Sequence, residues 1–427
     1  MKASRLLWGQ EMALRLVILE VVFCCVLNGI VRADGLAIRG FMRQYNSFSL
    51  HEDRELFRRN WLRLDLEYAP DEARFFASLD FVNENLSGEN VLEETLREAY
   101  IEFPLGPVDW TIGKQQTVWG KADGTFITDV VNPFDLRRNF LVFDFPDMRI
   151  GLNSVKATYY YNDTTLEVVW IPTFVPFKLA PPGAPWALSL PELPLPIIQI
   201  DDPALPDNSL SHSETGLRLL TRWRGYDITL NYLYVWDDLA LLDKQIVEDP
   251  IAGPGLVITP RFHRVHVPGY SLVNAFGSYV VRSEGALFLK RAFDTTDPEE
   301  EGFFVEKPFL NFMVGADYRI DENWLLLGQY IQGVILGGNG DIELDRLQTA
   351  MTLRLSGRLA DRELKPSIFW YFNFDDGDFW LWPEVSYKIL DGLNGVVGFH
   401  LFEGSAQSLY GQFDGNDYAF FKLQYSF

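Results

Sequence analysis

The sequence predicts an all-β fold, a transmembrane antiparallel β-barrel of about eighteen strands closed by pairing of its first and last strands. Three observations lead to this prediction. Segments of about ten to fourteen residues alternate apolar and polar side chains, the period of a strand with one buried face. Aromatic residues make up 15% of a chain of ordinary hydrophobic content, 48%. The connections are alternately short and long, as in barrels of the bacterial outer membrane.

The last twelve residues form the clearest predicted strand. Ala419, Phe421 and Leu423 fall on one face, and Lys422 and Gln424 fall on the other. The pattern resembles the closing strand of a Gram-negative outer-membrane barrel. In such strands a C-terminal phenylalanine, here Phe427, serves as the signal for the barrel assembly machinery. An edge strand of a soluble β-domain is the alternative explanation of this stretch.

Residues 1–33 are expected to be a signal peptide that is removed. Basic residues precede the apolar run Leu16 to Leu27, and Val31-Arg32-Ala33 offers small residues at a cleavage site. The only two cysteines, Cys24 and Cys25, lie in this segment, which excludes disulfides and thiolate metal sites from residues 34–427. Those residues contain no apolar run of about eighteen residues, so a membrane helix is not expected, and an exported membrane-spanning chain must then be a closed barrel.

Eighteen segments of residues 34–427 have the pattern of barrel strands. The segment Arg261–Val281 is interpreted as one long strand kinked at Pro268-Gly269, with two strands as the alternative. In chain order the predicted strands are Leu36–Tyr45, Phe57–Tyr68, Ala73–Val82, Leu96–Phe103, Asp109–Val118, Arg149–Tyr161, Leu166–Ile171, Glu214–Arg222, Ile228–Trp236, Arg261–Val281, Ala286–Phe293, Phe309–Tyr318, Trp324–Val334, Leu344–Leu355, Ser367–Phe374, Phe379–Tyr387, Gly392–Phe402 and Asn416–Phe427.

Three long connections, at about 119–147, 172–211 and 237–258, are predicted to lie on the outer side of the membrane. The second contains many prolines, which prevent regular strand pairing. It also contains the apolar run Leu193 to Ile200, which favours a buried position. The segment 172–211 is therefore the first candidate for a plug or lid of the lumen.

A progression of short motifs begins in the fourth predicted strand. It runs through Arg97-Glu98-Ala99-Tyr100, Gly113-Lys114-Gln115, Trp119-Gly120, Asp123, Asp129 and Asn132-Pro133-Phe134-Asp135. Over about forty residues it resembles the alginate-export-type porins and a related, largely uncharacterised family of outer-membrane barrels. The resemblance implies a barrel with a substrate-conducting lumen, and it implies site roles for the motif residues Lys114, Trp119, Asp123, Asp129, Asn132 and Asp135.

Two questions about this segment stay open from the sequence. Strict alternation places Lys114 with Trp110 and Ile112 on the lipid side, whereas the family pattern implies an inward cation; a bulge near Gly113 would reconcile the two. In the following loop, Asp129, Asp135, Arg137 and Arg138 either fold into the lumen as a constriction or form salt bridges that pin the loop to the wall.

Assigning the apolar faces of the strands to lipid gives a set of charged residues of both signs that line the lumen. Rings of charge set the selectivity of pores, so mixed rings argue against simple selectivity for one sign. The predicted lining residues are Arg63, Asp65, Arg74, Asp80, Glu98, Glu102, Glu214, Arg218, Arg222, Asp317, Arg319, Arg346, Arg354, Glu384, Lys388 and Lys422.

Sites for metals and for catalysis are not predicted. His263 and His266 are three apart on a strand and point to opposite faces. The acidic turns at 375–378 and 337–341 lack the spacing of a calcium-binding loop. No nucleophile elbow, phosphate loop or zinc-protease motif is present, so no cofactor and no enzymatic activity are expected.

The sequence therefore favours an outer-membrane channel for passive or substrate-guided passage of small hydrophilic solutes. A barrel that encloses a partner such as a multihaem cytochrome is the alternative, and a barrel-embedded enzyme is a third possibility. The expected partners are outer-membrane lipid, lipopolysaccharide and the barrel assembly machinery. The net charge of −22 argues against nucleic acid.

Overall fold

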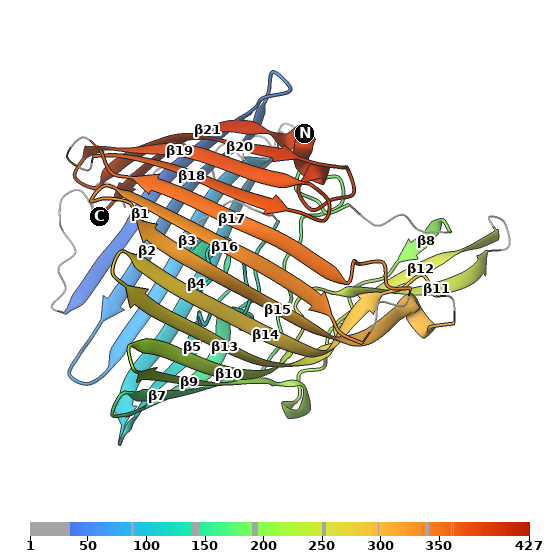
Figure 1. Ribbon diagram of the computed structural model, residues 1–427, viewed down its shortest axis with the longest axis horizontal. Helices are drawn as coiled ribbons and strands as arrows, with labels where there is room; N and C mark the ends of the chain where they lie inside the picture. Colours follow the sequence, from blue (N-terminus) through green and yellow to red (C-terminus); the bar gives the residue numbers. More distant parts are fainter. Residues whose placement is uncertain are drawn as a thin grey trace, which may run out of the picture.

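The computed structural model describes residues 35–86, 89–137, 145–189, 195–249, 253–297, 299–337, 341–359, 361 and 363–427. Its main feature is one sheet of 18 strands that closes on itself as a barrel (Figure 1). The predicted signal peptide and Arg138 lie outside the described residues. Within the described parts, no helix is both long and apolar enough to span a membrane.

The barrel strands are long, and most extend beyond the predicted segments. They are β1 (Leu36–Ser49), β2 (Glu55–Tyr68), β3 (Arg74–Leu86), β4 (Glu89–Leu105), β5 (Val108–Gln115), β6 (Leu152–Tyr161), β7 (Thr164–Ile171), β9 (Glu214–Trp223), β10 (Tyr226–Trp236), β13 (Arg264–Phe276), β14 (Tyr279–Asp294), β15 (Phe304–Arg319), β16 (Trp324–Ile335), β17 (Leu347–Gly357), β18 (Leu364–Asn373), β19 (Phe379–Leu390), β20 (Leu393–Glu403) and β21 (Tyr418–Ser426).

Every barrel strand pairs antiparallel with its neighbours along the chain, and the ring is closed by β1 and β21. The closing register runs from Phe41 opposite Ser426 to Ser49 opposite Tyr418. The backbones of Gly40 and Phe427 exchange two further hydrogen bonds of 3.1 Å. The predicted fold, including closure between the first and last strands, is confirmed, and closure leaves no free sheet edge in the barrel.

The two ends of the barrel differ. The short-turn end carries tight turns such as those between β6 and β7 and between β9 and β10, and β1 begins and β21 ends there. The long-loop end carries the connections after β5, β7 and β10 and the three 3-10 helices η1 (Leu210–His212), η2 (Glu301–Phe303) and η3 (Gly411–Asn416). The even number of strands places both ends of the sheet on the short-turn side.

The outward face of the barrel is apolar. Large side chains alternate with inward polar ones, and many are more than a third exposed, for example Leu217, Val314, Val397 and Phe421. Aromatic side chains gather near the short turns and are among the most exposed of all. They include Tyr68, Phe75, Tyr159, Tyr160, Tyr161, Trp223, Tyr226, Phe276, Tyr279 and Tyr387.

The prediction of a single strand at Arg261–Val281 is wrong. The segment Arg261–Val281 is not one strand, because a turn at Gly277-Ser278 separates β13 from β14 and Pro268 lies within β13, opposite Tyr232. The positive φ of Gly277, +59°, allows that tight turn. The predicted number of about eighteen strands still agrees with the structure, because the predicted strand Ala286–Phe293 is the second half of β14.

A second, small sheet was not predicted. It consists of β8 (Ile197–Ile200), β11 (Leu241–Asp249) and β12 (Gly253–Arg261), and it projects from the long-loop end (Figure 1). Two of the three predicted loops therefore contain strands. In β12, Leu256 and Ile258 are buried, so the small sheet has an apolar layer of its own.

Candidate functional site

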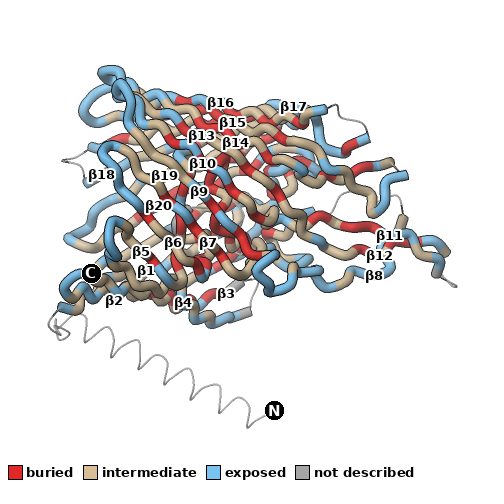
Figure 2. The backbone as a smooth tube through the Cα atoms, turned by 90° about the horizontal axis from the view of Figure 1, so that it is seen from below, coloured by how far each residue is buried: buried red, intermediate tan, exposed pale blue. Residues whose placement is uncertain are grey.

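The connection between β5 and β6, residues 116–151, turns into the barrel. Its described residues contact side chains of β2, β4, β7, β9, β14, β16 and β17, which together run around most of the wall. A segment that touches strands on all sides lies inside the ring. Among the described residues, the largest group of buried apolar residues combines Trp119, Ile127 and Val131 of this loop with inward side chains of the wall. Figure 2 shows buried positions (red) alternating with more exposed ones along the barrel strands. We call the described residues of this connection, 116–137 and 145–151, the inner loop.

Glu284 of β14 is the main anchor of the inner loop on one side. Its side chain is fully buried. One carboxylate oxygen accepts hydrogen bonds from the backbone N–H and the hydroxyl of Thr128, both at 2.8 Å. The other oxygen accepts from the backbone N–H of Lys121 at 2.6 Å. A buried carboxylate needs such donors, so Glu284 and the loop stabilise each other.

Further anchors tie the inner loop to the wall on either side of Glu284. Asp123 pairs with Arg354 of β17 at 2.7 Å and takes a hydrogen bond from Gln329 of β16 at its backbone oxygen. The indole N–H of Trp119 donates to Glu167 of β7 at 2.6 Å. Arg218 of β9 donates to that same Glu167 and lies over the Trp119 ring. The inner loop is thus held by charge-assisted contacts along its length.

Asp147 joins the inner loop to strands β1, β2 and β4 of the wall. It lies in the one-turn helix α2 (Phe145–Met148). Its carboxylate contacts three guanidinium groups, those of Arg63 at 2.6 Å, Arg43 at 3.1 Å and Arg97 at 3.4 Å. Burial alone raises the pKa of the Asp147 carboxyl, but the three arginines outweigh burial and hold its pKa below the ordinary value. We call Arg43, Arg63 and Arg97 the arginine cluster.

The arginine cluster is ordered by neighbouring side chains. Arg63 forms a bidentate pair with Asp80 of β3, at 2.7 and 2.8 Å. The guanidinium groups of Arg43 and Arg63 also lie over the ring of Phe41, at 4.5 and 5.0 Å from its centre. These contacts fix the positions of two of the three cations independently of the inner loop.

Arg97 faces inward because of a bulge. The pairing of β3 with β4 shifts between Ser78 and Leu79, which lie opposite Glu98 and Leu96 and leave Arg97 as the extra residue. Two consecutive side chains then point into the barrel: Arg97 reaches Asp147, and Glu98 accepts from the backbone N–H of Gln116 at 2.9 Å. An extra residue in one strand is the known way to break alternation.

A cavity of about 200 Å³ lies between the arginine cluster, the inner loop and the closing strands. The described residues that line it include seven cations and four carboxylates. The cations are Arg43, Arg59, Arg97, Lys114, Arg149, Lys178 and Lys422, and the carboxylates are Asp80, Glu93, Asp135 and Asp147. The lining of this cavity is therefore more basic than the acidic chain as a whole.

Many predicted lumen residues are on the inward face. Arg63, Asp80, Arg218, Arg354, Glu98 and Lys422 contact the inner loop or line the cavity. Asp317 pairs with Arg282, whose guanidinium also donates to the inner loop at Lys121. On the same faces as these by alternation are Asp65, Arg74, Glu102, Glu214, Arg319 and Glu384.

Three predicted lining residues lie near or just beyond strand ends. Arg346 directly precedes β17, and its backbone oxygen accepts from the N–H of Ile335 at the end of β16 at 2.9 Å. Lys388 pairs with Asp391, and Arg222 pairs with Asp227, both beside short turns. The sequence pattern could not separate the middle of a strand from its ends.

Lys114 lines the cavity, as the family pattern implies, and its ammonium donates to the backbone oxygen of Leu96 at 2.6 Å. A bulge, which would reconcile the two positions considered for Lys114, is not found in β5, because β5 pairs without a register shift on both sides. Instead, Gly113 immediately before it has a φ of +133°, and a Cβ there would lie 2.3 Å from the backbone oxygen of Ala99. The regular alternation of β5 is broken at this glycine.

The remaining motif residues hold the inner loop together. Asn132 accepts from the backbone N–H of Thr117 at 2.6 Å, and Asp129 pairs with Arg149 across the loop. Arg137 pairs with Asp135 and with Glu93 of β4, which pins the loop to the wall. Both alternatives considered for this loop thus apply, because it folds into the lumen and is pinned there by ion pairs.

The segment predicted as a plug has a smaller share in filling the lumen. Its first part, 172–189, lies against the inner loop: Lys178 and Phe134 form a backbone hydrogen bond of 3.0 Å, and Phe177 packs on the ring of Phe134. Trp186 is buried against Phe402 and Phe413. Residues 197–200 instead form β8, and Leu193 lies outside the described residues.

Sequence reasoning missed Arg43, Arg97, Glu167, Glu284 and Asp147. Alternation along β1 was sufficient to place Arg43 beside the predicted lumen residues. Arg97 depends on the bulge, and Glu284 was hidden because its strand was misplaced. No sequence signal marks Asp147, whose partners lie between 50 and 104 residues away.

Comparison with known proteins gives similar folds only. No family model matches the chain, and no curated protein matches it. Among solved structures, it is similar to OccK11 (OpdR) of Pseudomonas aeruginosa, with a TM-score of 0.51, 11% identity and coverage of 92% of this chain and 95% of that one. The chain is also similar to OpdK of the same organism, solved with vanillate. The TM-score is 0.50, the identity is 10%, and the match covers 92% of this chain and 98% of OpdK. At such identities the likeness shows the barrel fold alone.

Proposed function

We propose that this chain is an outer-membrane channel for small hydrophilic solutes and that its constriction favours solutes bearing a carboxylate. An apolar outward face with aromatic residues near the turns suits a strand barrel in lipid. The polar inward face and the width of an 18-stranded ring suit an aqueous lumen. The short-turn end then faces the periplasm, and the long-loop end faces the outside.

The observation that carries the solute preference is the contact of Asp147 with the arginine cluster. Three guanidinium groups surround one carboxylate that belongs to a loop and not to the wall. Arginine binds carboxylates through paired hydrogen bonds as well as charge, so a carboxylate solute can compete for the same donors. The excess of cations around the cavity attracts anions to this point.

The inner loop favours a channel over a barrel that encloses a partner protein. A folded partner in the lumen would have to displace a loop that is bound to β2, β4, β7, β9, β14, β16 and β17. Small solutes require only local rearrangement around the cavity. The cytochrome partner and the assembly machinery remain predictions of the sequence.

Planar-bilayer recording of the purified chain tests the proposal. A gradient of potassium chloride should give a reversal potential of anion-selective sign, and benzoate should enter protein-containing liposomes faster than benzamide of the same size. Replacing residues 119–147 by a short glycine-serine linker should raise the conductance. Absence of conductance in both proteins would refute the channel, and cation selectivity would refute only the carboxylate preference.

A further inference from the structure

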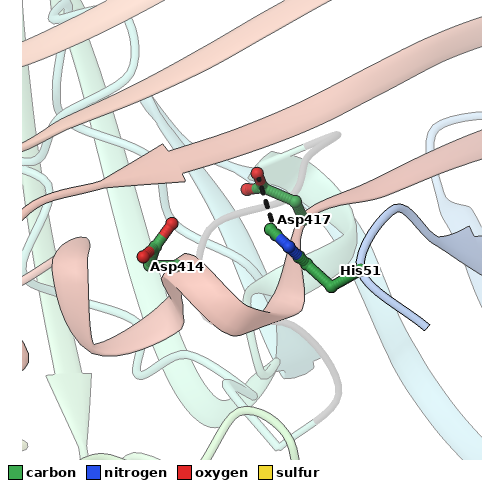
Figure 3. Close-up of side chains that lie close together, drawn as sticks. All are labelled: His51, Asp414 and Asp417. Carbon is green, nitrogen blue, oxygen red and sulfur yellow. Dashed lines mark ion pairs between the residues drawn. The ribbon is translucent and has the colours of Figure 1, made fainter.

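A histidine and two aspartates meet at the long-loop end, next to the place where the first and last strands close the barrel. His51 lies in the connection between β1 and β2, Asp414 lies in η3, and Asp417 follows η3 directly before β21 (Figure 3). Each residue offers one ligand atom, and the three atoms lie within 4.8 Å of one another. We infer that these residues form a binding site for a divalent transition metal, with Zn²⁺ as the best-fitting ion.

The geometry of the first pair agrees with a tetrahedral ion. His51 Nε2 and Asp417 Oδ2 are 3.3 Å apart. Bonds of about 2.0–2.1 Å from zinc to nitrogen and oxygen place neighbouring ligand atoms roughly 3.3 Å apart in a tetrahedron. Asp414 is exposed, so its side chain can rotate to close the remaining distance. Water would take the fourth position.

The backbone around the site is fixed before any ion binds. The backbone N–H of Leu50 donates to the backbone oxygen of Asp417 at 2.9 Å, which joins the two connections. Asp417 Oδ1 accepts from the backbone N–H of Phe402 at 2.7 Å, so its other oxygen is directed toward His51. Outer contacts of this kind orient metal ligands.

The protein core holds η3 in place from behind. Phe413, next to Asp414, is buried and packs against Trp186 and Phe402, with ring centres 5.6 and 6.2 Å away. On the His51 side, the hydroxyl of Ser49 accepts from the backbone N–H of His51 at 3.2 Å. The two loops therefore present their ligands from anchored positions, while His51 and Asp414 stay accessible to solvent.

The ligand set determines the class of ion. Calcium and magnesium prefer sites made of oxygen alone, whereas imidazole nitrogen suits zinc and related metals. One imidazole with two carboxylates matches the nitrogen and oxygen ligands of zinc. The ion would join the β1–β2 connection to η3 and so brace the outer end of the seam between β1 and β21.

Calorimetric titration of the metal-free, folded full chain in detergent with zinc chloride tests the inference. One Zn²⁺ per chain should bind, and the variants His51→Ala and Asp414→Asn should each lose at least about tenfold in affinity. His212→Ala is the control, because His212 is another histidine of a long-loop connection and is only half-buried. Heat-dependent gel mobility identifies folded samples of every variant.

Four results would overturn the site. Absence of zinc binding by the folded wild-type chain would leave His51 and Asp417 as a simple ion pair. Equal affinity of wild type and His51→Ala, or equal loss in His212→Ala, would place the zinc elsewhere. Displacement of zinc by an equal concentration of calcium would refute the transition-metal assignment.

Discussion

The guanidinium Nη1 of Arg63 lies 2.6 Å from Oδ1 of Asp147, a contact between the second strand of the barrel and a loop that begins after the fifth. Arg63 also donates two hydrogen bonds to Asp80, from Nε to Oδ1 and from Nη2 to Oδ2. One arginine thus joins a partner in the wall to a partner in the loop. This arrangement leads to several predictions about conduction and stability.

Replacing the loop carboxylate should release the arginine cluster. Asp147→Asn removes the charge that faces three guanidinium groups, and breaking a buried ion pair costs roughly 3–5 kcal/mol. We expect a higher conductance and a reversal potential shifted toward anions in bilayer recordings. Asp163→Asn, in the exposed turn between β6 and β7, is the control. Lower anion selectivity in Asp147→Asn would contradict the role of the cluster.

Acid should have the same effect on the wild-type channel. The pKa of Asp147 is lowered in the folded protein, because its arginine partners outweigh burial. The stabilising contribution is therefore complete above the ordinary value of 3.8 and is lost as the pH falls through the lower folded value. Conductance should rise only below that ordinary value. A rise at higher pH, or the same rise in Asp147→Asn, would exclude Asp147 as its cause.

Neutralising a cation of the cavity should weaken anion selectivity. Lys422 lines the cavity from the closing strand, so Lys422→Gln lowers the positive charge at the constriction. The reversal potential in a potassium chloride gradient should move toward zero. Arg224→Gln removes the same charge from a short turn and should leave the potential unchanged. Equal shifts in the two variants would place the selectivity outside the cavity.

Removing the anchor of the inner loop should make the loop accessible. Glu284→Ala leaves the donors of Lys121 and Thr128 without their acceptor, at roughly 1–3 kcal/mol for each buried donor. Trypsin should then cleave after Lys121 faster than in wild type. Glu284→Gln retains an acceptor oxygen and should show a smaller increase. Unchanged cleavage in the alanine variant would mean that other contacts suffice to hold the loop.

Gly113 should resist substitution. In Gly113→Ala, the new Cβ would lie 2.3 Å from the backbone oxygen of Ala99, and the φ of +133° is rarely adopted by residues other than glycine. We expect a clear loss of stability, by at least about 1 kcal/mol relative to Gly106→Ala. Gly106 has a φ of +64° but no atom within 4 Å of its Cβ position. Thermal loss of folded gel mobility measures both variants, and equal stability would contradict the steric argument.

Much of the barrel could be predicted because alternation is a local signal. In β2, Arg63 and Asp65 are two residues apart, so their shared face follows from the strand period alone. Alternation also gave an even number of strands, which places both ends of the sheet on the same side and so predicted the pairing of β21 with β1. The strand boundary at Gly277-Ser278 was missed, since Pro268-Gly269 gives a stronger local turn signal although Pro268 lies inside β13.

The candidate sites depended on contacts that alternation does not report. Arg97 points inward only because a bulge adds one residue to β4, and Lys114 lines the cavity beside a glycine with positive φ. His51 and Asp417 meet because β1 and β21 close the ring.

By itself, the sequence determined that the chain is a barrel of about eighteen strands with charged side chains inside. It did so because the face of a strand residue is set by its immediate neighbours. Only the tertiary structure decided that the inner loop folds into the lumen and that Asp147 lies among three arginines. The position of a loop side chain depends on how distant strands wrap around it, and no local pattern encodes that arrangement.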